Sequence, residues 1–134
     1  MAYYGEYRLS MTQGGRIALP KKIRDELGDT KLVITKGEGG CLFGYDVKSW
    51  EGRVQELLHL PLAERDTKEN LTKRRIIFSS TVYLETDEQG RVVLPKALRV
   101  FAILSKTTLI AGVGDHFEIW DMNKWTEYIS STKS

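Results

Sequence analysis

The chain contains the same segment twice, and the two copies align without a gap at an offset of 75 residues. GGRIALPKKIR, which begins at Gly14, returns as QGRVVLPKALR, which begins at Gln89, and the match continues as far as Trp50 and Trp125. A unit of this length that occurs only twice is not a solenoid repeat, so it predicts two half-domains that bury their apolar faces against each other. We therefore expect a pseudo-twofold protein whose functional surface is formed twice.

The length and composition are those of one globular domain. We predict a single domain, residues 1–134, built from tandem repeats at about 5–60 and 78–134 that are joined by a helical bridge at 61–77. With 41% hydrophobic residues the chain can bury one core without disulfides, and its single cysteine, Cys41, is typical of a reducing cytoplasm. Because no apolar run is long enough to cross a bilayer, we expect no membrane partner.

Each repeat has the pattern of a strand, a glycine turn, a second strand and a short helix. Pro20 and Pro95 suit the first position of the short helices, because the fixed φ of proline fits there. Further along, GEGG and GVGD are expected to be the tips of hairpins. The predicted strands are 7–11, 17–19, 32–35 and 41–45 in the first repeat, and 82–86, 92–94, 108–111 and 117–120 in the second.

A second helix is predicted in each repeat, with Asp46 or Asp121 as its N-cap and Trp50 or Trp125 folded back onto the core. In the first repeat this helix runs toward Leu60 and ends before Pro61. The charged stretch 63–75 is predicted to be one further helix that bridges the repeats. Its buried side is expected to include Leu71 and the run 76–78.

Basic residues concentrate in the repeated segments, although the net charge is only +2. Residues 16–24 and 91–99 contain bases and no acid, so the distribution of charge points to an anionic partner more clearly than the total does. We expect Lys22, Arg24 and Arg99 to face outward from the short helices. The unopposed bases are Arg16, Lys21, Lys22 and Arg24 in the first repeat, and Arg91, Lys96 and Arg99 in the second.

The glycine-arginine turn is the leading functional candidate. Gly15 and Gly90 allow a positive-φ turn that approaches a ligand closely, and Arg16 or Arg91 at the tip offers a planar fork suited to a phosphate or to a guanine edge. The alternative is a purely structural turn in which Asp87 and Arg91 pair across the tip.

Other reactive residues do not form a recognisable catalytic or metal-binding motif. Cys41 and His116 occupy equivalent positions, but two ligands fall short of a structural zinc site, and a buried thiol and a partly exposed histidine are expected instead. His59 lies in the apolar context LLHLPL. Because no nucleophile with its base and no paired carboxylates can be identified, we expect neither an enzyme nor a cofactor.

The strand, the D-x-x-G-R turn, the LP pair and the short basic helix, duplicated in one chain, resemble the MraZ family of bacterial transcriptional regulators, members of the AbrB-like swapped-hairpin group. Gly5 stands at the family's early glycine, and residues 87–91 reproduce its D-x-x-x-R signature. DTKENLTKRRIIFSS, from Asp66, resembles the segment between the family's repeats, and GVGDHFEIWD, ending at Asp121, resembles its second hairpin and helix start.

This resemblance implies an α+β fold, a double-repeat swapped-hairpin β-barrel with flanking helices. It also implies sequence-specific binding of double-stranded DNA at direct repeats in promoters of the division and cell-wall gene cluster, including the protein's own operon. The partners would be this DNA and further copies of the chain in a ring-like homo-oligomer, in the cytoplasm and associated with the nucleoid. The DNA-binding residues would be Arg16, Arg91, Gly15, Gly90, Asp87, Lys21, Lys22, Arg24, Lys96 and Arg99.

One departure from the signature concerns the first repeat. Thr12 stands where the signature has Asp, so the carboxylate that would orient Arg16 is absent and the first loop is expected to be looser. The rival hypothesis is a protein-interaction module, antitoxin-like or scaffolding, whose basic turns bind an acidic partner. The near-neutral net charge favours this alternative.

Overall fold

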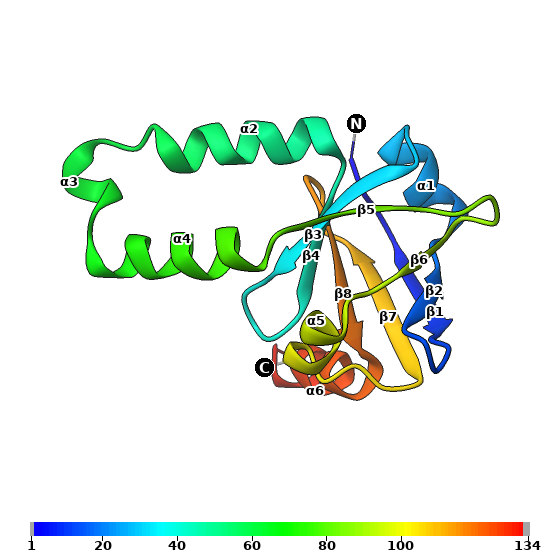
Figure 1. Ribbon diagram of the computed structural model, residues 1–134. Coiled ribbons are helices and arrows are strands. Elements are labelled where there is room, and N and C mark those ends of the chain that lie inside the picture. The colour runs from blue at the N-terminus through cyan, green and yellow to red at the C-terminus, as the bar shows by residue number, and fades with distance from the viewer. Residues whose placement is uncertain (1, 133–134) are drawn as a thin grey trace.

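The computed structural model describes residues 2–132, which form eight strands and six helices (Figure 1). All eight predicted strands are confirmed, each within one residue of its expected ends. The first repeat contains β1 (Glu6–Ser10), β2 (Arg16–Ala18), α1 (Lys21–Leu27), β3 (Lys31–Lys36), β4 (Leu42–Tyr45) and α2 (Val47–Leu58). The bridge contains α3 (Leu62–Arg65) and α4 (Lys68–Ser80). The second repeat contains β5 (Val82–Glu85), β6 (Arg91–Val93), α5 (Lys96–Phe101), β7 (Thr107–Gly112), β8 (Phe117–Asp121) and α6 (Met122–Thr132).

Six of the strands form one antiparallel sheet in the order β1-β7-β8-β4-β3-β5. The first strand of each repeat pairs with the third strand of the other: Tyr7 lies opposite Ile110, and Leu84 lies opposite Leu32. The order is therefore symmetric about the β8–β4 pair, with each repeat's first strand transferred to its partner. The α+β class is confirmed, and the sheet joins the two repeats.

The remaining strands, β2 and β6, form a two-stranded antiparallel ribbon in which Ile17 lies opposite Val92. The sequence pattern of strand, turn and strand indicates a local hairpin, and the structure differs: β1 enters the six-stranded sheet, whereas β2 pairs with the other repeat. Among residues 2–132 the hydrogen-bonded ladders thus form a sheet and a ribbon, and not one closed barrel.

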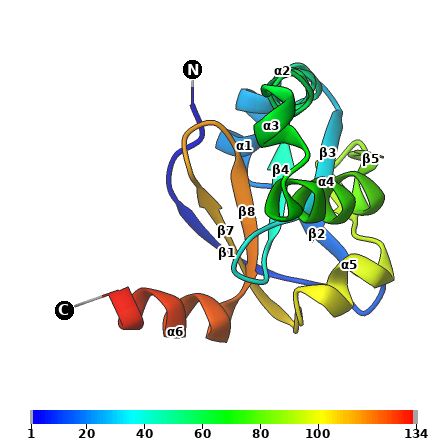
Figure 2. The same cartoon turned by 90° about the vertical axis from the view of Figure 1, so that its left-hand side faces the viewer.

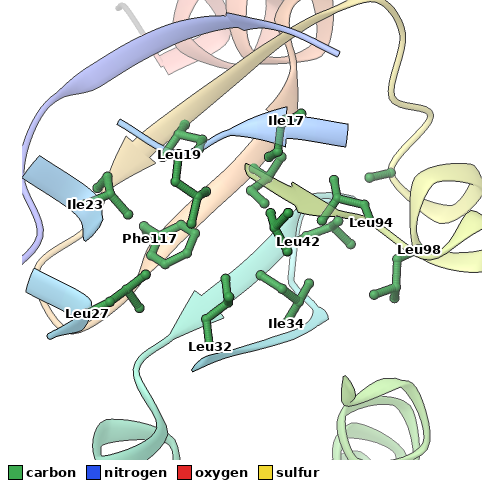
Figure 3. Close-up of a cluster of buried hydrophobic side chains, with 14 of the residues drawn as sticks. Ile17, Leu19, Ile23, Leu27, Leu32, Ile34, Leu42, Leu94, Leu98 and Phe117 are labelled. Carbon is green, nitrogen blue, oxygen red and sulfur yellow. The ribbon is translucent and has the colours of Figure 1, made fainter. Parts of the chain in front are cut away.

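The main core lies between the ribbon and the sheet (Figure 3). Ile17 and Val92, from the ribbon, are 1% and 2% exposed, and Phe117, from β8, is fully buried. The predicted apolar stripes of the short helices are confirmed, since Ile23 and Leu98 join the same cluster. Both repeats contribute to this cluster, and burying each such side chain is worth about 1.5–3 kcal/mol. The ribbon is therefore fixed to the protein by its inner face, while its outer face stays free for contacts.

The second helix of each repeat begins as expected. Asp46 accepts a hydrogen bond from the Ser49 N–H at 3.0 Å, and Asp121 accepts one from the Asn123 N–H at 3.1 Å. Trp50 is buried at 3% exposure, as predicted. Trp125 is only half-buried and packs its ring against Trp120 at 5.5 Å between centroids, so it covers the outside of the sheet and does not enter the main core.

The bridge differs from the prediction, because it contains two helices and not one. Helices α2 and α4 project together away from the sheet with α3 at their far end (Figures 1 and 2). The helix is interrupted before Thr67, which is the N-cap of α4 and accepts a hydrogen bond from the Asn70 N–H at 3.2 Å. Ile77 and Phe78 pack near Trp50 as expected, but Ile76 is 47% exposed, so its predicted burial is wrong. No helix within residues 2–132 is both long and apolar enough to cross a membrane.

Candidate nucleic-acid interface

Two equivalent loops carry the predicted arginines: loop 1, residues 12–16, and loop 2, residues 87–91. In each loop the first N–H donates to the last C=O, at 3.0 Å in loop 1 and 2.8 Å in loop 2. The fourth N–H donates back to the first C=O, at 2.9 and 3.0 Å. The fourth residue is Gly15 or Gly90, with φ of 81° and 75°, where a larger residue would be strained. The sequence prediction of a positive-φ glycine turn is thus confirmed in both copies.

The ribbon brings the two arginines onto one surface. Ile17 and Val92 point into the core, and because side chains alternate along a strand, Arg16 and Arg91 lie on the outer face. Both arginines line one hollow of about 360 Å³ together with Asp87. Residues 75 positions apart in the sequence therefore belong to one site.

The two arginines are held differently. In loop 2 an oxygen of Asp87 accepts hydrogen bonds from the N–H groups of Gln89 and Arg91, both at 2.9 Å, and the other oxygen accepts from the Arg91 Nε at 3.0 Å. These donors, led by the Arg91 N–H, hold the pKa of Asp87 below its usual range. In loop 1 the Thr12 hydroxyl accepts only the Arg16 N–H, at 3.2 Å. Among residues 2–132 no acid lies within ion-pair distance of Arg16, whose side chain is exposed.

Arg24 is exposed as predicted, whereas Arg99 is only partly exposed, and each guanidinium group also makes a hydrogen bond that the sequence did not predict. The Arg24 Nε donates to the Leu19 C=O at 3.1 Å, and the Arg99 Nε donates to the Leu94 C=O at 3.0 Å. Both side chains bend back over the ribbon ends because these carbonyls lie beyond the last ladder bonds. Sequence reasoning missed this role, although the identical spacing from glycine to arginine in the two copies, nine residues, is the signal that points to it.

The predicted lysines lie on the exposed surface of the short helices beside the loops. Lys22 and Lys96 are exposed and have no acid within ion-pair distance among residues 2–132. Lys21 pairs with Asp25 at 3.2 Å on the same helix, an exposed pair that contributes little to stability. The arginine-bearing ribbon is thus flanked by exposed positive charges on both sides.

The buried thiol and the partly exposed histidine that the sequence predicts are confirmed. Cys41 is fully buried, and burial raises the pKa of its thiol, so it stays protonated. His116 is partly buried between Asp115 and Glu118, and His59 is exposed as the residue that follows α2. In the part of the chain that the structure describes, no group of three or more His, Cys, Asp or Glu side chains is placed to hold a metal ion.

Comparisons with known proteins point to one family. The family model described as "MraZ protein, putative antitoxin-like" matches residues 2–73 and 77–134. The chain is 37% identical over 126 residues to a transcriptional regulator MraZ from Acetivibrio thermocellus, covering 94% of this chain and 85% of the relative. It is 40% identical over 121 residues to one from Caldicellulosiruptor saccharolyticus, covering 90% and 82%.

A third relative with the same name, from Ligilactobacillus salivarius, is 38% identical over 94% of this chain and 85% of its own length. Among solved structures, the solution structure of PHS018 from Pyrococcus horikoshii covers 88% of this chain and 97% of its own, with a TM-score of 0.37 and 18% identity, a likeness too loose to support an argument. The family model and the relatives, however, span nearly the whole chain, and they show that this protein belongs to the MraZ family.

Proposed function

We propose that this chain is a sequence-specific DNA-binding transcriptional regulator. The observation that carries the proposal is the placement of Arg16 and Arg91 on the outer face of one ribbon, in a common hollow, with lysines on both sides. The names of its relatives, transcriptional regulators, support the same conclusion. A narrow two-stranded ribbon is one of the elements that the major groove of DNA admits.

The two kinds of basic residue have different tasks in this proposal. Arg16 and Arg91 enter the groove and read base edges, where Gly15 and Gly90 let the backbone come close. Asp87 holds the Arg91 guanidinium in one direction. Phosphates are neutralised by Lys21, Lys22 and Lys96 together with the outward nitrogens of Arg24 and Arg99.

The proposed biological setting follows the family resemblance. The targets are direct repeats in promoters of the division and cell-wall gene cluster, including the protein's own operon, and the site of action is the cytoplasm, on the nucleoid. The chain acts as one domain of two tandem repeats, 5–60 and 78–134, whose sheet and ribbon together form a swapped-hairpin barrel of the AbrB-like kind. Copies of the chain assemble into a ring, and a ring that contacts several boxes gains effective concentration over a single subunit.

Binding to DNA tests this proposal directly. Fluorescence anisotropy should show tighter binding to a duplex with direct repeats from upstream of the protein's own gene than to a scrambled duplex of equal length. Affinity should fall steeply between about 50 and 200 mM salt, because lysine and arginine contacts release counterions. Equal affinity for both duplexes, or affinity that does not respond to salt, would contradict the proposal.

A second candidate is a protein-interaction module whose basic turns bind an acidic partner. The antitoxin-like description of the matching family model and the net charge of only +2 favour it. This candidate predicts that DNA binds weakly and without preference for repeats, so the same anisotropy measurement separates the two.

A further inference from the structure

Each loop glycine is covered by an arginine from the other repeat. A Cβ atom placed on Gly15 would lie 2.5 Å from the Nε of Arg99, in α5, and a Cβ on Gly90 would lie 2.6 Å from the Cδ of Arg24, in α1. The arginine therefore fills the space that a side chain on the glycine would need. Because the same contact occurs in both directions across the pseudo-twofold axis, each loop is closed by the opposite half of the molecule.

The same arginine also fixes the backbone that meets the glycine. The Leu94 N–H donates to the Gly15 C=O at 2.9 Å, and the Leu94 C=O in turn accepts from the Arg99 Nε at 3.0 Å. The equivalent bonds around Gly90, ending at Arg24, measure 3.0 and 3.1 Å. Each arginine thus lies against a loop glycine with its Cδ, Nε and Cζ atoms and, with its Nε–H, holds the residue that binds the same glycine's carbonyl.

We propose that Arg24 and Arg99 are positioning residues that act crosswise: Arg99 sets the conformation of loop 1, and Arg24 sets that of loop 2. The proposal rests on the proposed DNA-binding function, because it explains how the loops hold Arg16 and Arg91 for base reading. Lysine cannot replace arginine here. Its donors lie only at the end of a four-carbon stem, whereas arginine carries an Nε–H directly beside the stem that packs on the glycine.

The two loops depend on this contact to different degrees. Loop 2 is also held by the three hydrogen bonds of Asp87, whereas Thr12 supplies a single one to loop 1. Loss of Arg99 therefore disturbs loop 1 more than loss of Arg24 disturbs loop 2. A substitution of Arg99, in the second repeat, is therefore expected to change how Arg16, in the first repeat, contacts DNA bases.

Hydrogen exchange on the DNA-free, full-length protein tests the crosswise contact. In Arg99→Lys, exchange should become faster in residues 12–17 and stay unchanged in residues 87–92, and Arg24→Lys should give the reverse, smaller pattern. Lys22→Ala is the matched control, since it removes a neighbouring positive charge that has no described contact with either loop. Unchanged exchange in the opposite loop, or a change confined to the variant's own repeat, would overturn the proposal.

DNA binding then separates positioning from phosphate neutralisation. A positioning role predicts that Arg99→Lys, which keeps the positive charge, reduces discrimination between repeat and scrambled DNA by about threefold to tenfold, the range for one lost hydrogen bond, with the salt slope unchanged. Arg99→Ala removes the charge as well and should also lower the slope by about 0.9 for each lost phosphate contact. If Arg99 only neutralises phosphate, Arg99→Lys keeps the discrimination of the unchanged protein, and this result would overturn the proposal. If no form of the protein binds DNA, the proposed function fails, and the exchange pattern still decides the contact.

Discussion

Loop 1 and loop 2 have the same backbone but hold their arginines differently. Their closing hydrogen bonds agree within 0.2 Å, and both fourth residues are glycines with positive φ. The first three residues of the loops differ, and the first of them decides how the arginine is held: Asp87 binds the guanidinium of Arg91, whereas Thr12 binds only the Arg16 N–H. Backbone shape is thus set by the glycine and the ribbon, and the direction of the arginine is set by one side chain. The two repeats have therefore kept the same loop backbone, but they differ in the side chain that fixes the direction of the arginine.

The same contrast appears farther from the ribbon. Helix α2 of the first repeat and the hairpin tip of the second repeat line a hollow of about 500 Å³ that includes Tyr45 and Arg53. At the equivalent positions of the second repeat, Trp120 and Tyr128 stack at 5.2 Å between ring centroids. The same two positions therefore line a hollow in the first repeat and form an aromatic stack in the second. We expect that removing the strand pairs between the repeats disrupts the whole fold. Substitutions in loop 1 or loop 2 should instead show how the two loops differ in DNA binding.

Separating the repeats should have the largest effect. A fragment of residues 1–60 loses β7 and β5, the strand partners of β1 and β3, and it loses β6, the partner of the ribbon strand. Residues such as Ile17 and Leu32, which are 1% and 0% exposed in the full chain, would be uncovered. We expect the fragment to be unfolded as a monomer by circular dichroism, or to fold only as a dimer in which two copies replace the natural pair. A cooperative unfolding transition from a monomeric fragment would contradict the shared core.

Removing the two arginines one at a time compares the loops directly. Arg91→Ala should reduce discrimination between repeat and scrambled DNA by about tenfold to a hundredfold, the range for loss of one base contact. Arg16→Ala should have an equal or smaller effect, because Arg16 lacks a carboxylate that fixes its direction. Lys96→Ala is the control, and it should weaken binding to both duplexes alike. If neither arginine variant changes discrimination while circular dichroism shows an intact fold, the loops do not read DNA.

Exchanging the first residues of the loops tests whether a single side chain causes the difference. Asp87→Thr should free the Arg91 guanidinium and lower discrimination by about threefold to tenfold, the range for one hydrogen bond. Thr12→Asp should place a carboxylate where it can accept the Arg16 Nε, and discrimination should rise by a smaller factor. Anisotropy titrations of both variants and of the double exchange measure this. If Asp87→Thr leaves the discrimination between repeat and scrambled DNA unchanged, Asp87 does not cause the difference between the two loops.

Sequence reasoning could find what is local and missed what crosses between the repeats. The β-favouring runs, the glycine turns and the caps Asp46 and Asp121 depend on neighbouring residues, and they were predicted correctly. The transfer of β1 and β5 between the repeats depends on partners about 50–105 residues away, which no local pattern encodes. The same holds for Arg24 and Arg99: nothing in the local pattern predicts that each lies against the glycine of the opposite repeat's loop. The break at Thr67 was missed because the stretch 63–75 is charged throughout and has no glycine or proline to mark an interruption.

The equivalent positions Cys41 and His116 predict the smallest difference between the repeats, which concerns how stability depends on pH. Burial opposes the charged form of His116, but hydrogen bonds from its ring nitrogens to Glu118 at 3.0 Å and Asp115 at 2.7 Å outweigh burial and raise its pKa above 6.5. Both bonds require a proton on each nitrogen, so this arrangement favours the imidazolium form. Since the pKa is higher in the folded state, the contribution to stability is complete below about pH 6.5 and is lost as the pH rises through the folded value.

Thermal unfolding between pH 6 and 9 measures this contribution. The melting temperature should decrease across that range, because the stabilisation by the protonated histidine is lost as the pH rises. His116→Gln should have a lower melting temperature at pH 6 and a smaller decrease toward pH 9, because glutamine keeps hydrogen-bonding groups and has no titrating proton. Cys41→Ala is the control from the first repeat: its thiol stays protonated through this range because burial raises its pKa, so the slope with pH should match that of the unchanged protein. A slope that is identical in His116→Gln would show that the histidine between its two carboxylates does not set the pH response, and that the second repeat does not differ from the first in this respect.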